Sequence, residues 1–270
     1  MALNTIKNKY PLNYVIHLMI KYIFILFISL GCFAQNNTPK TAHVFVALCD
    51  NIHQGIVPVS KTLGNGQNPR TNLYWGALYG VKTHFKKSKD WIYIKSIPSE
   101  NSQILERVLF KHATTNTYLL ADAYDGKHIK QATIDFLKAS SGDFQTTITT
   151  DNKKLKFGGK SGLVSYIGHD GLMEFQLDIN LRKGANDRDA IILACYSKDY
   201  FKPYLSKTNA NPLVWSTGLM SPEAYTLKWA LDGWIQEKPD NEIRELAAQA
   251  YHQYQKCGMR GARNLLVTGS

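Results

Sequence analysis

Two apolar stretches of the chain each end beside a residue that can take part in catalysis. Residues 165–171 (SYIGHDG) lead into His169, and residues 189–197 (DAIILACYS) lead into Cys195. Apolar stretches with β-branched residues are typical of buried strands in a parallel sheet, and functional groups collect beyond the carboxyl ends of such strands. If the two strands are neighbours, an imidazole and a thiol reach one crevice. That pair is the minimum needed for catalysis by a thiolate nucleophile.

The rest of the pattern places strands and helices around these two segments. We expect further strands at residues 44–48, 91–94, 108–110, 118–121 and 213–215, and helices at residues 73–85, 129–137, 221–235 and 241–256. Residues 108–110 and 118–121 are predicted to pair as a hairpin. The alternation of strands and helices predicts an α/β fold over residues 43–270, a three-layer sandwich with a mainly parallel sheet.

Three connections give weaker signals. Residues 53–72 form a loop rich in Gly and Pro, and a loop of this length is often functional. Residues 140–161 are expected to be a polar connection rich in Thr, Gly and Lys. Between the two catalytic candidates, residues 173–179 alternate between apolar and polar types, which predicts a strand or a small hairpin within the crossover.

The order of these features resembles that of the caspase-like (clan CD) cysteine peptidases, which include caspases, gingipains, clostripain and legumains. The resemblance rests on His169 with Gly171 close by, and on Ala194 and Cys195 at the end of a later strand. It covers roughly residues 43–235 in element order but only about a dozen residues in motif. The family usually has Gly directly after the His, where this chain has Asp170.

The resemblance implies a mechanism. Cys195 would attack a peptide carbonyl as a thiolate, and His169 would protonate the leaving amine. The backbone N–H groups of Cys195 and Asp170 would stabilise the oxyanion, a contribution of about 3–4 kcal/mol where the geometry holds. Ser216 and Thr217 follow the next strand, where the family often forms its specificity pocket.

Three further residues are pocket candidates on their position alone. Asp50 and Asn51 end the first strand and could orient His169 or bind a substrate side chain, although strand-ending turn chemistry is the favoured interpretation. Glu223 could select a basic substrate residue, against the favoured interpretation of a carboxylate in the first turn of a helix. An inert core cysteine and a hydrogen-bonded turn histidine remain the alternatives for the dyad itself.

The N-terminus has the pattern of an export signal. An apolar core at residues 22–30 follows Lys21, and residues 32–34 offer a small-residue cleavage site. We therefore expect a signal peptide at residues 1–34, with Met19 as an alternative start, and a tether at residues 35–42. Gly31 and Cys32 also fit an imperfect lipobox, so a lipid anchor at Cys32 is an alternative. The chain is expected to be exported: periplasmic, envelope-anchored or secreted.

The composition of the chain limits the classes of partner and cofactor that we expect. The formal net charge is +11, but no recognised binding motif accompanies the scattered Lys and Arg, so nucleic acid is not the expected partner. The chain has neither a CxxC nor an HExxH motif, and we expect no metal and no cofactor. The sequence thus predicts an exported caspase-like cysteine peptidase acting on a peptide or protein. The alternative is a non-catalytic envelope binding module on the same fold.

Overall fold

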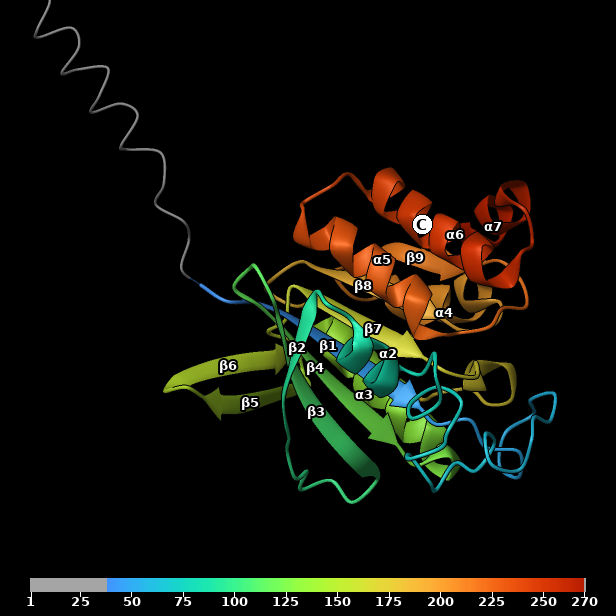
Figure 1. Ribbon diagram of the computed structural model, residues 1–270, viewed down its shortest axis with the longest axis horizontal. Coiled ribbons are helices and arrows are strands. Elements are labelled where there is room, and N and C mark those ends of the chain that lie inside the picture. Colours follow the sequence, from blue (N-terminus) through green and yellow to red (C-terminus); the bar gives the residue numbers. More distant parts are fainter. Residues whose placement is uncertain (1–37, 270) are drawn as a thin grey trace, which may run out of the picture. The chain divides into compact units, whose positions relative to one another are not determined.

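The computed structural model describes residues 38–269, and residues 39–269 belong to one compact unit. Its centre is an eight-stranded sheet with the strand order β10-β9-β8-β7-β1-β4-β3-β2 (Figure 1). The strands are β1 (Lys40–Ala47), β2 (Trp91–Ser96), β3 (Ile104–His112), β4 (Thr117–Tyr124), β7 (Leu163–Ile167), β8 (Arg188–Leu193), β9 (Ala210–Ser216) and β10 (Leu266–Val267).

Five neighbouring strands form the parallel part of this sheet. β4, β1, β7, β8 and β9 pair in parallel, whereas β2, β3 and β10 add antiparallel strands at the two edges. Every residue of β4 and β7 is buried, because other elements cover both faces of this part of the sheet. The expected hairpin is confirmed as the antiparallel pair β3 and β4.

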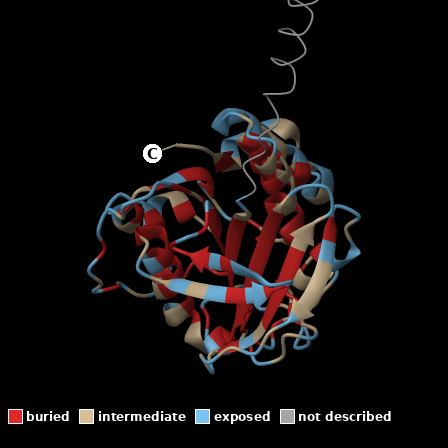
Figure 2. Ribbon diagram, turned by 90° about the vertical axis from the view of Figure 1, so that its left-hand side faces the viewer, coloured by how far each residue is buried: buried red, intermediate tan, exposed pale blue. Residues whose placement is uncertain are grey.

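Helices cover the two faces of the sheet. One face packs against α2 (Val81–Lys87), α5 (Ala224–Ile235), α6 (Asp240–Gln255) and α7 (Met259–Leu265). The other face packs against α3 (Ile129–Ser141) and α4 (Ser197–Leu205). Figure 2 shows the buried strands enclosed between these layers. The expected α/β architecture with a mainly parallel sheet flanked by helices is therefore confirmed.

Several sequence-based expectations for the connections are wrong. Residues 140–161 contain a second, two-stranded sheet of β5 (Gln145–Thr150) and β6 (Lys153–Gly158), whose Ile148, Leu155 and Phe157 pack against β3 and β4. The expected strand at residues 173–179 is absent; that segment has one 3-10 turn, η2 (Gly171–Met173), and then no regular structure. The helix expected at residues 73–85 is reduced to α2, because turns occupy most of residues 71–80.

The N-terminal segment of the described chain enters the sheet directly. β1 begins at Lys40, so the last residues of the expected tether are part of the sheet. The expected signal peptide, the alternative start at Met19 and the lipid-anchor candidate Cys32 lie outside the described residues.

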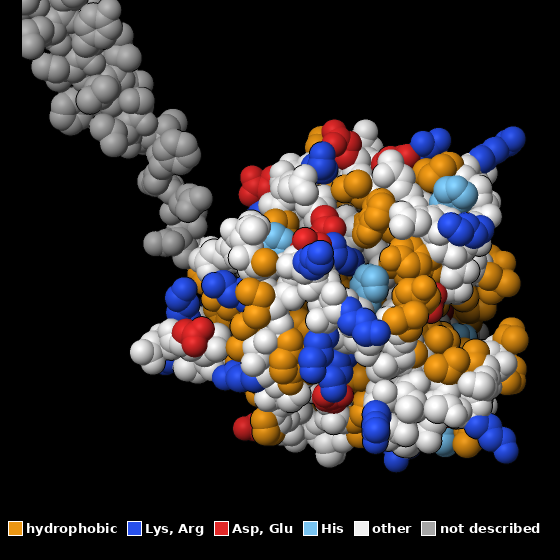
Figure 3. All heavy atoms as spheres, in the orientation of Figure 1, with side chains coloured by type: hydrophobic (Ala, Val, Ile, Leu, Met, Phe, Trp, Pro, Cys, Tyr) orange, Lys and Arg blue, Asp and Glu red, His pale blue; other side chains and the backbone are white. Residues whose placement is uncertain are grey.

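Figure 3 shows Lys and Arg side chains spread over one face, with Asp and Glu among them. No helix within residues 38–269 is long and apolar enough to cross a membrane.

Candidate active site

Adjacent strands carry the two catalytic candidates to one edge of the sheet. β7 and β8 are parallel neighbours, and Ile167 pairs with Leu193 in their last register position. His169 and Cys195 each follow that pair by two residues, so they occupy equivalent places beyond the carboxyl ends of the strands. Both line the same cavity of about 390 Å³. The expectation that the two groups meet at one crevice rested on strand adjacency, and β7 and β8 are adjacent.

Unusual backbone conformations flank both candidates. Gly168 has φ = +150°, and a Cβ at this position would lie 2.7 Å from the carbonyl oxygen of Ala47 in β1, so only Gly fits before His169. Tyr196, directly after Cys195, is in the left-handed region with φ = +50°. It turns the chain from β8 into α4 and leaves Cys195 at the turn. Left-handed conformations of residues other than Gly cluster at functional sites.

The Cys195 thiol is half-buried and contacts the loop after β9. Its sulfur accepts a hydrogen bond from the N–H of Met220 at 3.4 Å and lies 3.6 Å from the carbonyl oxygen of the same residue. Burial raises the pKa of the Cys195 thiol, and the charge of Asp170 raises it further, whereas the Met220 N–H acts in the opposite direction. The resting thiol is therefore protonated at neutral pH, and its activation requires a base.

His169 is fixed on both sides. Its exposed fraction is 7%, and its carbonyl oxygen accepts a hydrogen bond from the hydroxyl of Tyr166 at 2.8 Å. Nε2 of the ring lies 2.5 Å from Oε1 of Glu174. Within residues 38–269, Nδ1 makes no hydrogen bond. It is also not one of the side-chain atoms that are fully buried without a hydrogen-bond partner. An imidazole that donates Nε2–H to a carboxylate has Nδ1 free to accept a proton.

Glu174 is a site residue that sequence reasoning missed. The same Oε1 that faces His169 also accepts the N–H of Gly55 at 2.5 Å. Gly55 belongs to the loop after β1, and the next residues of that loop, Ile56 and Val57, line the cavity. One carboxylate therefore joins the imidazole to a cavity wall. A carboxylate five residues after a candidate His was the only available signal, and it was hidden in a segment interpreted as a strand.

Asp170 brings a buried carboxyl to the site. Its exposed fraction is 0%; Oδ1 accepts the N–H of Leu172 at 3.0 Å, and Oδ2 has no hydrogen-bond partner among the residues that the structure describes. Burial raises the pKa of Asp170 to about 7; the Leu172 N–H opposes this shift, and the charge of Glu174 adds to it. The residue that replaces the Gly of the caspase-like pattern is thus a carboxyl that ionises near neutrality.

The two backbone N–H groups expected at the oxyanion position differ in surroundings, since Cys195 lines the cavity whereas Asp170 is fully buried and is not one of the lining residues. In the described part of the chain, neither the Cys195 N–H nor the Asp170 N–H donates a hydrogen bond. By contrast, the N–H of Tyr196 is bound to the carbonyl of Gly218 at 2.9 Å and cannot serve. A backbone N–H that donates to the reacting carbonyl oxygen can stabilise its developing negative charge.

The substrate-pocket candidates divide into one residue in the cavity and four outside it. Glu223 lines the cavity. The buried Ser216 hydroxyl donates to the carbonyl of Ala194 and accepts the N–H of Ser197, so it fixes the turn that carries Cys195. Thr217 is exposed and bonds to the carbonyls of Asn264 and Leu265.

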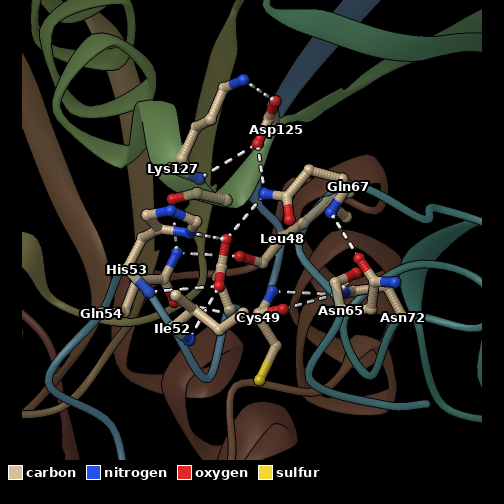
Figure 4. A network of polar contacts seen from close by, with 12 residues as sticks. Leu48, Cys49, Ile52, His53, Gln54, Asn65, Gln67, Asn72, Asp125 and Lys127 are labelled. Carbon is tan, nitrogen blue, oxygen red and sulfur yellow. Dashed lines mark hydrogen bonds and ion pairs between the residues drawn. The ribbon is translucent and has the colours of Figure 1, made fainter. Parts of the chain in front are cut away.

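Asp50 and Asn51 act on the loop that forms the cavity wall. Asp50 is buried, accepts the N–H of Ile52 at 2.9 Å and lies 2.8 Å from Nδ1 of His53. Figure 4 shows His53, Gln67 and Asp125 gathered in this network, while the sulfur of Cys49 points away from it. The side chain of Asn51 bonds to both the N–H and the carbonyl of Val59, a wall residue. Both candidates therefore make loop contacts, which agrees with the turn chemistry favoured for them.

Comparison with known proteins gives no relative for this chain, and the described residues hold two further free cysteines and no metal site. No family model matches this chain, and no curated protein or solved structure matches it either. Cys49, Cys195 and Cys257 are free thiols, and burial raises the pKa of Cys49 to about 11. Residues 38–269 contain no group of three His, Cys, Asp or Glu side chains that could hold a metal ion.

Proposed function

We propose that this chain is an exported cysteine endopeptidase of the caspase-like type, in which His169 and Cys195 form the catalytic dyad. The observation that carries the proposal is their equivalent position two residues after β7 and β8, with both residues in the wall of one cavity. It is also supported by the N–H groups of Cys195 and Asp170, which donate no hydrogen bond within residues 38–269. The proposed export rests on the signal-like sequence of residues 1–34.

The proposed reaction is hydrolysis of a peptide bond through a thioester intermediate. The Cys195 sulfur attacks the peptide carbonyl carbon, and its proton passes to Nδ1 of His169 while the N–H groups of Cys195 and Asp170 stabilise the oxyanion. The C–N bond then breaks, His169 gives the proton to the leaving amine, and a thioester remains. Water, deprotonated by His169, cleaves the thioester, releases the carboxylic acid and restores the thiol.

One observation favours the alternative of a non-catalytic envelope binding module. The pKa of the Cys195 thiol is raised by burial and by Asp170, whereas reactive cysteines have a lowered pKa. In the peptidase, His169 must take the proton during the attack. In a binding module, the same cavity would hold a peptide without cleaving it.

Turnover of a quenched fluorescent peptide library separates the two functions. The peptidase proposal expects hydrolysis by the wild type, none by Cys195→Ala, and full activity in Cys257→Ala, the matched control at the exposed thiol. Equal hydrolysis by wild type and Cys195→Ala would refute the dyad. Saturable peptide binding without hydrolysis by the wild type would identify a binding module instead.

A further inference from the structure

The cavity beside Cys195 has mainly apolar walls formed by two separate loops. The loop after β1 contributes Ile56, Val57 and Val59, and the loop after β9 contributes Leu219 and Met220. Ligand sites in proteins are commonly of this kind, mostly apolar with a few polar groups that fix orientation. The polar groups here include the two members of the proposed dyad.

Apolar side chains at the rim of the cavity are largely exposed. Val57 is 88% exposed and Leu219 is 71% exposed, although both belong to the cavity wall. In Figure 3 hydrophobic side chains gather on the right-hand side, toward which β1 and β7 point in Figure 1. Exposed apolar groups that cluster around a cavity indicate a binding surface, because a ligand that covers them removes apolar area from water.

The charges in the wall do not favour a charged ligand. The lining within residues 38–269 contains no Lys and no Arg that could pair with an acidic side chain. Its acid, Glu223, already accepts hydrogen bonds through Oε2 from the Tyr225 hydroxyl at 2.9 Å and from Gln255 at 3.3 Å. The other oxygen, Oε1, makes no hydrogen bond within the described residues, but a basic side chain that reached it would be buried among apolar groups, which is costly for a charge.

We propose that this cavity takes an uncharged apolar side chain, of the size of Leu, Met or Phe, from the substrate residue whose carbonyl is attacked. The inference rests on the proposed peptidase function. Its geometric reason is that the sulfur bonds to the carbonyl carbon of that residue, whose side chain branches one atom away. A cavity with the sulfur in its wall is therefore within reach of that side chain.

Binding to the Cys195→Ala variant of the full chain tests the inference without requiring turnover. Three acetylated peptides, built from Gly and Ser except for one central Leu, Lys or Asp, are titrated by calorimetry. The Leu peptide is expected to bind at least about tenfold more tightly than the other two, in line with the discrimination that apolar pockets achieve. Equal affinities, tighter binding of Lys or Asp, or no binding of any peptide would overturn the inference.

A substitution at the rim tests whether the preference for the Leu peptide arises from this cavity. Leu219→Asp is expected to lower the affinity for the Leu peptide about tenfold, whereas Ile92→Asp, at an exposed apolar residue of β2 outside the cavity wall, is expected to leave it unchanged. Equal losses in both variants would overturn the inference.

Turnover by the wild type separates failure of the inference from failure of the proposed function. Fluorogenic substrates with the same three residues before the cleaved bond should follow the same order in kcat/KM. If no substrate is cleaved but the Leu peptide binds best, the peptidase proposal fails while the apolar preference of the cavity stands. If the Lys or Asp substrate is cleaved fastest, the peptidase stands and the inference fails.

Discussion

Glu174 and His169 are joined by a contact of 2.5 Å between Oε1 and Nε2, across only five residues of chain. The same oxygen accepts the Gly55 N–H, so the imidazole and the loop after β1 share one anchor. A carboxylate in this position selects the tautomer that carries a proton on Nε2 and leaves Nδ1 as the base.

Glu174→Gln is expected to lower kcat by about 10- to 100-fold with little change in KM, because Gln can hydrogen-bond to the ring but cannot stabilise the imidazolium formed during the reaction. Steady-state kinetics on a peptide substrate measure this, and Glu174→Asp should retain more activity than Glu174→Gln. Asp178→Asn, at an exposed acid in the same connection, is the control. Unchanged kcat in Glu174→Gln would show that the contact has no role in catalysis.

Asp170 makes the stability of the fold dependent on pH. Its pKa is raised from 3.8 to about 7 by burial, so the native state holds its proton more tightly than the unfolded state. The stability of the wild type is therefore greatest below about pH 4 with respect to this group, and it falls as pH rises toward 7.

Asn cannot ionise, so Asp170→Asn removes the loss of stability that accompanies ionisation of Asp170 at rising pH. The free energy of unfolding of the variant, minus that of the wild type, should increase by up to about 1.4 kcal/mol per pH unit between pH 4 and 7 and then level off. Urea unfolding at several pH values measures it, with Asp151→Asn in the exposed β5–β6 turn as the control. A difference that does not vary with pH would contradict the prediction.

The buried ion pair of Arg107 and Asp122 should contribute strongly to stability. Arg107 donates two hydrogen bonds to Asp122, at 2.6 and 2.7 Å, and His43 lies 3.0 Å from the same carboxylate. Burial opposes ionisation of Asp122, but Arg107 and His43 outweigh it and the pKa of Asp122 is lowered.

Asp122→Ala should destabilise the fold by about 3–5 kcal/mol in urea unfolding, because it leaves the Arg107 charge buried and unpaired. Asp143→Ala, which breaks the exposed pair with Arg182, should change stability little. Similar losses in the two variants would show that burial does not control the energetics of these pairs.

Gly168→Ala should be costly through both its backbone conformation and its surroundings. At φ = +150° a Cβ meets the Ala47 carbonyl oxygen, and we expect a loss of about 2–5 kcal/mol together with lower kcat, because His169 follows directly. Gly258→Ala is the matched control, since its φ of +77° is also positive but no atom lies within 4 Å of the added Cβ. Its loss should be about 1–2 kcal/mol. Equal losses of stability would show that the close approach of β1 to Gly168 does not add to the cost of the substitution.

The sequence was sufficient for the parts of the fold that depend on local pattern. Residues 190–193 and most of residues 163–167 are apolar because both of their faces are buried, and this pattern predicted β7 and β8. The apolar spacing and the Ser-Pro-Glu start at residues 221–223 located α5 to within three residues.

The remaining features depend on contacts between distant segments. β5 and β6 are rich in Thr and Lys, and only their packing on β3 and β4 makes them strands. The anchor of His169 includes the Gly55 N–H, which lies 119 residues from Glu174 in the chain. No local pattern encodes such a contact, so the carboxylate partner of the imidazole became visible only in the fold.

Covalent labelling by a peptidyl fluoromethyl ketone ending in Leu tests the proposed dyad most directly. The Cys195 sulfur should displace fluoride and gain the mass of the inhibitor less HF, and mass spectrometry of the digested protein identifies the labelled residue. We predict a single adduct at Cys195 that forms at least about 100-fold more slowly in His169→Gln, because the base is lost. Labelling at Cys257 with Cys195 unmodified, or an equal rate in His169→Gln, would contradict a His169/Cys195 peptidase.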